Sequence, residues 1–130
     1  MSGNNGQGSN WITKKRRAAI YARDKHRCVW CTQGVIAGPL PDYRADVTQL
    51  ASLDHVQPRA RGGDNRTPNL LTCCMGCNRK RGDQTVRAFA FMLAAEAHQH
   101  PMQFEKRAAF MISILVRVIM AISTPLPRAE

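Results

Sequence analysis

An aspartate directly followed by a histidine is the first feature of this sequence that could do chemistry. Asp54 and His55 lie in the stretch SLDHVQPRARGGDN at 52–65. A carboxylate offers oxygen ligands to a divalent cation, and an imidazole suits a general base that activates water. Taken alone, the pair fits a surface contact, a metal ligand beside a base, or a chance neighbourhood. Other parts of the chain have to decide among these interpretations.

Four of the five cysteines form two pairs of identical spacing. Cys28-x2-Cys31 and Cys74-x2-Cys77 have the spacing that lets four thiolates converge on a tetrahedral zinc ion. The alternative is a set of buried apolar cysteines, which rarely repeat at this spacing. Cys73 could also pair with Cys77, but Cys74 reproduces the spacing of the first pair. An odd number of cysteines without a recognisable export signal disfavours a disulfide framework, so we predict structural zinc.

The cysteine pairs enclose the Asp-His pair. Residues 32–73 separate them, a much longer insert than the roughly 15–20 residues of a simple zinc ribbon. A zinc ion would therefore tie together the ends of an inserted unit and bring Asn78 close to it. Asp54 and Asn78 offer too few oxygens for a calcium site but suit Mg²⁺ or Mn²⁺, which keep several waters.

The elements that must position these residues follow from local patterns. We expect a strand over 50–56, a loop rich in proline and glycine over 57–68, and a second strand over 69–73. A helix is expected to begin near Cys77. Side chains of adjacent strand residues point to opposite faces, so one member of the Asp-His pair can bind a cation while the other faces a different element.

Helices are expected on both sides of this unit. The stretch 11–27 is typical of a basic helix with a narrow apolar stripe. After a break at Gly82, a helix capped by Asp83 is expected to run to Pro101. The last expected helix, 102–122, is strongly apolar. Its most apolar stretch, 108–122, is shorter than the roughly 20 residues that cross a bilayer, which predicts no membrane span.

The charge balance favours a polyanionic partner. The chain holds 19 Lys and Arg against 9 Asp and Glu, a formal net charge of +10, and its 44% hydrophobic content disfavours wholesale disorder. Such a footprint is typical of nucleic-acid binding, although a solvated basic surface is the simpler alternative. Six basic residues near the Asp-His pair and Asn78 are expected to contact phosphates: Arg59, Arg61, Arg66, Arg79, Lys80 and Arg81.

The stretch LDHVQPRARGGDNRTPNLLTCCMGCNRK, residues 53–80, resembles the HNH endonuclease motif. The shared landmarks are Asp-His, Pro, Gly-Gly, Asn-Leu and Cys-x2-Cys-Asn, in that order. The upstream stretch RRAAIYARDKHRCVWC, residues 16–31, is similar to the segment that precedes the motif in zinc-stapled members. The resemblance implies an α+β fold, namely a small ββα-metal (HNH) motif with a zinc knuckle pair of four cysteines, flanked by an N-terminal basic helix and C-terminal helices.

The resemblance also implies a role for each site residue. His55 would be the general base, and Asn69 would steady the loop and the orientation of that base. Asp54 and Asn78 would bind the catalytic ion. The chain departs from the family name because its last position is Asn rather than His, which shifts the expected ion toward Mg²⁺ or Mn²⁺. The implied reaction is hydrolysis of DNA phosphodiester bonds, with one ion stabilising the leaving 3′ oxygen.

The expected organisation has four parts. Residues 1–10 form a disordered tail, 11–82 the HNH nuclease domain, 83–123 a C-terminal helical extension and 124–130 a second tail.

The expected partner is double-stranded DNA, and the apolar C-terminal helix suggests a homodimer or an assembly partner, as in a phage or mobile element. The expected location is the cytoplasm of a bacterial cell. The rival interpretation is a noncatalytic zinc-containing DNA-binding module or a phage packaging component.

Overall fold

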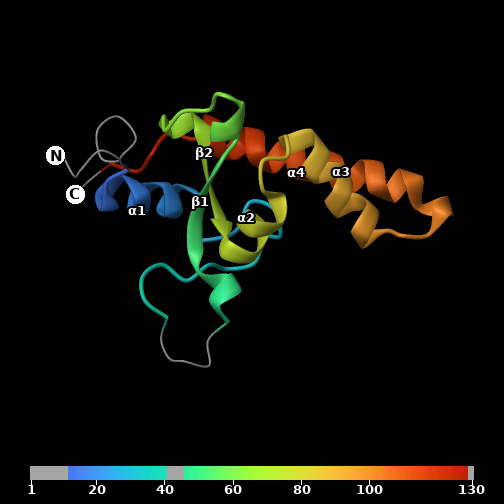
Figure 1. The fold of residues 1–130 in the computed structure, drawn as a ribbon, viewed down its shortest axis with the longest axis horizontal. Coiled ribbons are helices and arrows are strands. Elements are labelled where there is room, and N and C mark those ends of the chain that lie inside the picture. Colours follow the sequence, from blue (N-terminus) through green and yellow to red (C-terminus); the bar gives the residue numbers. More distant parts are fainter. Residues whose placement is uncertain (1–11, 41–45, 129–130) are drawn as a thin grey trace.

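Two antiparallel strands and the helix after them form the centre of the fold (Figure 1). The structure is a computed structural model, which describes residues 12–40 and 46–128. Strand β1 (Ala51–His55) pairs with β2 (Leu70–Cys74), so that Asp54 lies opposite Leu71 and His55 opposite Leu70. Helix α2 (Met75–Arg81) begins directly after β2. The predicted α+β class and the strand–loop–strand–helix order are confirmed.

Helix α1 (Lys14–Arg23) is shorter than the expected helix over 11–27. It ends where Lys25 and His26 take left-handed backbone angles, with φ of 57° and 54°, which stop a right-handed helix. Ile20 is fully buried and packs in one cluster with Leu70 of β2. The helix therefore lies against the sheet, and one of its basic residues, Arg23, is buried there and donates to the Leu70 carbonyl at 2.7 Å.

Helices α3 (Val86–Ala97) and α4 (Phe104–Ser123) pack along each other and extend away from the sheet (Figure 1). Phe89 of α3 and Ile114 of α4 are buried in the same cluster as Trp30 and Leu71. The two helices thus share a core with the cysteine-containing unit. The proposed division of the chain at residue 82 stays a prediction, and the expected tail at 1–10 lies outside the described residues.

The expected helix starts need two corrections. Thr85, and not Asp83, caps α3, because its hydroxyl accepts a hydrogen bond from the backbone N–H of Ala88 at 3.1 Å. The last helix begins at Phe104, since a 3₁₀ turn over Pro101–Gln103 precedes it. Within the described part of the chain, no helix is long and apolar enough to cross a membrane.

Candidate functional site

The four paired cysteines form one cluster. The Sγ atoms of Cys28, Cys31, Cys74 and Cys77 all lie within 4.8 Å of one another, and those of Cys31 and Cys74 are 3.9 Å apart. A tetrahedral zinc ion with Zn–S bonds of about 2.3 Å separates its sulfurs by about 3.8 Å, so four thiolates in this arrangement fit zinc. The predicted grouping is confirmed, and Cys73 lies outside it.

The second knuckle follows from the junction of β2 and α2. Cys74 is the last residue of the strand and the N-cap of the helix, where its sulfur accepts a hydrogen bond from the backbone N–H of Cys77 at 3.3 Å. Cys73 precedes it in the strand and points to the opposite face, with its sulfur 3.2 Å from the hydroxyl oxygen of Ser52. Strand alternation therefore separates the spare thiol from the cluster.

The thiols differ strongly in acidity. A hydrogen bond from the Cys77 thiol lowers the pKa of Cys28 to about 5, while burial raises the pKa of Cys31 to about 11. The cluster therefore favours a negative charge on Cys28, and thiolates are the form in which cysteines bind a metal ion. Burial, together with the charge of Asp54, raises the pKa of Cys73 and keeps it an unreactive thiol.

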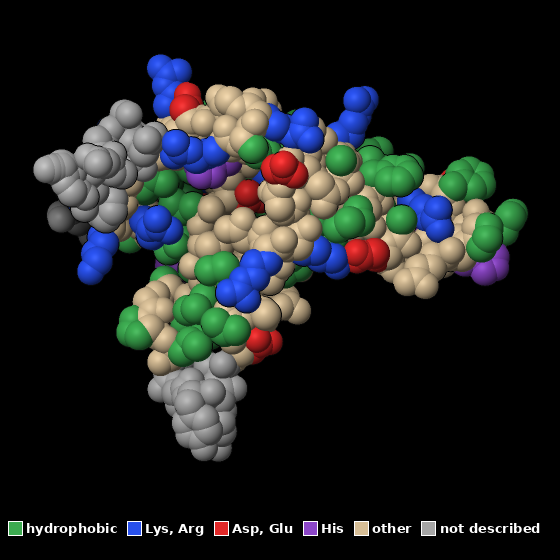
Figure 2. Space-filling model, in the orientation of Figure 1, with side chains coloured by type: hydrophobic (Ala, Val, Ile, Leu, Met, Phe, Trp, Pro, Cys, Tyr) green, Lys and Arg blue, Asp and Glu red, His purple; other side chains and the backbone are tan. Residues whose placement is uncertain are grey.

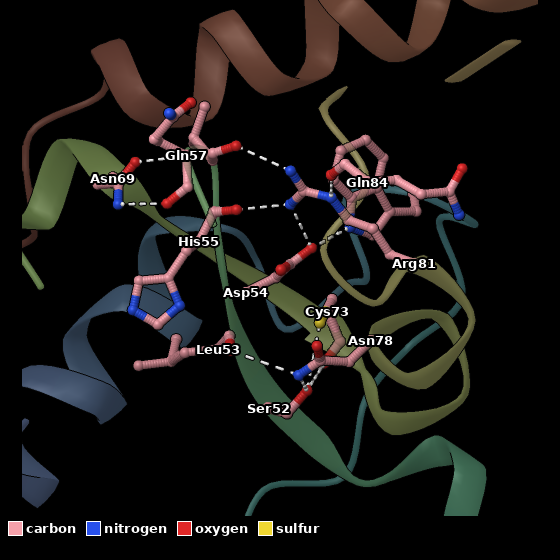
Figure 3. A network of polar contacts seen from close by, with 12 residues as sticks. Ser52, Leu53, Asp54, His55, Gln57, Asn69, Cys73, Asn78, Arg81 and Gln84 are labelled. Atoms are coloured by element: carbon pink, nitrogen blue, oxygen red, sulfur yellow. Dashed lines mark hydrogen bonds and ion pairs between the residues drawn. The ribbon is translucent and has the colours of Figure 1, made fainter. Parts of the chain in front are cut away.

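Asp54 and His55 point to opposite sides of β1 (Figure 3). Asp54 is 6% exposed, and its carboxylate faces α2. Its Oδ2 accepts hydrogen bonds from Trp30 Nε1 at 2.9 Å and from Arg81 Nη1 at 2.8 Å. His55 is half-buried on the other side of the strand, so the two members of the pair have separate surroundings, as strand geometry predicts.

Arg81 is buried at the centre of the site, with 1% of its surface exposed. Besides its ion pair with Asp54, it donates to the backbone carbonyls of His55 at 2.5 Å and Val56 at 2.8 Å. We expected Arg81 to contact DNA phosphate, and its burial contradicts that prediction. A buried carboxylate needs a nearby counter-charge, and Arg81 supplies it while holding the end of β1 against α2.

Asn69 holds the loop between the strands. Its Oδ1 accepts from the backbone N–H of Gln57 at 2.8 Å, and its Nδ2 donates to the carbonyl of Asp64 at 2.8 Å. Gly63 approaches the same region so closely that a Cβ there would lie 1.7 Å from the carbonyl oxygen of Gln57. These contacts support the loop-steadying role expected of Asn69.

The residue that contacts the imidazole is Asn65, which sequence reasoning did not identify. Its Oδ1 lies 2.7 Å from His55 Nε2, and its carbonyl accepts a hydrogen bond from the guanidinium of Arg16 in α1. Because an amide oxygen only accepts, Nε2–H is the donor in this contact, which leaves Nδ1 for a different partner. Asn65 follows Gly-Gly-Asp in the loop, but nothing in the sequence distinguishes it from the other polar residues there.

Asp54 and Asn78 supply oxygen atoms on the same side of the sheet. Asn78 lies in α2 and faces β1, because its Nδ2 donates to Ser52 Oγ at 3.0 Å and to the Leu53 carbonyl at 3.4 Å. These bonds leave the amide oxygen of Asn78 as an acceptor, and both hydrogen bonds described for Asp54 go to Oδ2, which leaves Oδ1. One carboxylate oxygen and one amide oxygen fit Mg²⁺ or Mn²⁺.

The other predicted phosphate contacts lie at the surface. Figure 2 shows Lys and Arg side chains at several places on the visible face. Arg61 Nε donates to the carbonyl of Asp83 at 2.8 Å, and Lys80 forms an ion pair with Glu96 at 2.5 Å. All five remaining candidates are exposed: Arg59, Arg61, Arg66, Arg79 and Lys80.

The comparison with protein families agrees with this geometry. The family model described as HNH endonuclease matches residues 44–94. The match contains both strands, the loop, α2 and most of α3, and it includes His55 and Asn78. The resemblance to HNH endonucleases is thereby confirmed over this segment. No curated protein and no solved structure matches the chain.

The cysteine cluster yields a test with a matched control. Cys28→Ser should lower the zinc content and the unfolding temperature, because a structural zinc ion contributes its binding free energy to folding. Cys73→Ser replaces an equally buried thiol outside the cluster and should leave the zinc content unchanged. Metal analysis and thermal unfolding of both variants measure this difference. Equal zinc loss in the two variants would contradict the assignment of the ligands.

Proposed function

We propose that this protein is a metal-dependent endonuclease that hydrolyses phosphodiester bonds of double-stranded DNA, with His55 as general base. The match to HNH endonucleases supports a nuclease-type activity. The observation that carries the proposal is the hydrogen bond between Asn65 Oδ1 and His55 Nε2. It fixes the ring and leaves Nδ1 as the atom that accepts a proton from water.

The proposed metal ligands and the proposed base lie on opposite sides of β1. On one side Asp54 and Asn78 would hold Mg²⁺ or Mn²⁺. Such an ion, when bound, supplies positive charge for the leaving 3′ oxygen. On the other side, Asn65 orients the base, and Arg81 fixes the backbone of His55 through its carbonyl. The products would carry 5′-phosphate and 3′-hydroxyl ends.

Two further parts complete the proposal. The cysteine cluster binds structural zinc and ties the ends of the inserted unit together. The exposed arginines near the loop and α2 contact phosphates, which gives binding that depends on salt and little on sequence.

Removing the base tests the activity. His55→Ala should lower plasmid cleavage with Mg²⁺ or Mn²⁺ by about 10²- to 10⁴-fold, because the proposed general base is lost. His100→Ala is the matched control, since His100 is exposed at the junction of α3 and α4. Gel analysis of the plasmid measures both.

The outcome also separates the proposed activity from its first rival. If the unmodified chain binds DNA but cuts with neither ion, the protein is a noncatalytic zinc-containing DNA-binding module. If His55→Ala cuts as fast as the unmodified chain, His55 is not the base.

The exposed arginines yield a test of DNA binding. Arg79→Ala should weaken binding to all duplexes and reduce the slope of log K against log salt concentration by about 1, because one phosphate contact is lost. Lys106→Ala removes the same charge from exposed α4 and should leave the slope unchanged. Fluorescence anisotropy over a salt series measures this. Equal slopes for the two variants would show that Arg79 acts only through net charge.

A second proposal concerns α4. Ile112, Val116, Ile119 and Met120 are each at least 50% exposed and share one side of the helix. We propose that this side contacts another protein surface, either a second copy of the chain or a component of a larger assembly such as a phage particle.

The oligomeric state separates these two partners. If a second copy covers α4, the purified chain should sediment as a dimer, and Ile119→Asp should return it to a monomer by burying a charge in the contact. A monomer with full nuclease activity would contradict the dimer. The component of a larger assembly would then be the proposed partner of α4.

A further inference from the structure

Trp30 lies inside the first cysteine knuckle, between Cys28 and Cys31. Its side chain is 1% exposed. The two cysteines of the knuckle flank Trp30 in the sequence. The Trp30 carbonyl accepts a hydrogen bond from Arg117 Nη2 of α4 at 2.9 Å. The position of the indole is therefore set by the cysteine cluster and by the C-terminal helix together.

Figure 3 shows the buried ion pair between Asp54 and Arg81, and the indole contacts both of its members. Nε1 donates to Asp54 Oδ2 at 2.9 Å, and the guanidinium carbon of Arg81 lies 5.1 Å from the ring centroid. On another side, Phe89 packs edge-to-face at 5.1 Å between ring centroids. One side chain thus links the metal-binding knuckle, the core of α3 and the carboxylate of the proposed catalytic site.

Two donors fix one oxygen of Asp54. Because Trp30 and Arg81 both hold Oδ2, the carboxylate cannot rotate freely, and Oδ1 is kept in a single direction. Loss of a hydrogen-bond partner of a metal-binding carboxylate commonly lowers metal affinity or activity by about 10- to 100-fold. The Trp30 N–H is the only donor to Asp54 in the described residues that comes from the zinc-binding knuckle.

We infer that Trp30 is a positioning residue for Asp54, through which the first cysteine knuckle sets the affinity of the site for its divalent ion. The inference rests on the proposed function, because it concerns the ion that Asp54 and Asn78 would hold. It assigns to the knuckle a second role besides folding, since loss of the indole contact should affect the catalytic ion even where zinc remains bound.

Trp30→Phe tests this inference because it keeps an aromatic ring and removes only the N–H donor with part of the ring. The zinc-loaded full chain is titrated with Mn²⁺, and unbound Mn²⁺ is measured by electron paramagnetic resonance. We expect the affinity for Mn²⁺ to fall about 10- to 100-fold while one zinc ion per chain is retained.

Phe89→Leu is the matched control. It removes the edge-to-face contact but leaves the Trp30 N–H next to Asp54. The unfolding temperature should fall, and the affinity for Mn²⁺ should stay that of the unmodified chain. If Phe89→Leu weakens Mn²⁺ binding as much as Trp30→Phe does, Trp30 acts only through packing and the inference fails.

A second measurement uses the native indole and does not depend on how Trp30→Phe folds. In a Trp11→Phe background, Trp30 is the only tryptophan. Its Nε1–H signal in nitrogen-15 NMR should shift as Mg²⁺ is added, because the hydrogen-bonded carboxylate gains a cation. A signal that stays in place while the protein cleaves DNA with Mg²⁺ would overturn the inference.

The outcomes separate the two proposals. A chain that binds Mn²⁺ and cleaves DNA, but whose Trp30→Phe variant binds Mn²⁺ equally well, overturns the positioning role and leaves the nuclease intact. A chain that neither binds Mn²⁺ nor cleaves DNA overturns both.

Discussion

The buried ion pair between Asp54 and Arg81 is the interaction on which the site depends. It joins the end of β1 to the end of α2, and the same guanidinium holds the carbonyls of His55 and Val56. Removing one partner of such a pair leaves an unpaired buried charge, which commonly costs about 3–5 kcal/mol. The position of His55 therefore depends on a contact made by the residue before it, on the opposite side of the strand.

The cysteine cluster and the ion pair form one continuous structure. The knuckle places Trp30 against Asp54 and Arg81, and the second knuckle starts the helix that carries Arg81 and Asn78. The loop side is built separately, since Asn69 ties its two ends and Asn65 links it to α1 through Arg16. The base and the proposed metal ligands are thus supported by different elements, although they are adjacent in the sequence.

Local patterns predicted much of this arrangement, because cysteine spacing and strand alternation act over a few residues. They did not predict the burial of Arg81, which lies in a run of three basic residues that is typical of a charged surface. The helical period contained a usable signal, since Arg81 follows Asn78 by three residues and must share its inward side. Asn65 offered no such signal, because its position depends on a contact with Arg16 of α1, which lies 49 residues earlier in the sequence.

The ion pair also limits how the proposed site can bind its ion. Arg81 already neutralises the charge of Asp54, so one carboxylate oxygen and the amide oxygen of Asn78 attract a divalent ion only weakly. A Mg²⁺ ion in such a site fills its shell with waters and with phosphate oxygens of the substrate. Within the proposed function, DNA and the ion therefore bind cooperatively, because each supplies charge or ligands that the other lacks. Neutralising Asp54 keeps the buried fold stable without DNA, and substrate phosphate would then complete the coordination shell of an ion that Asp54 and Asn78 already hold.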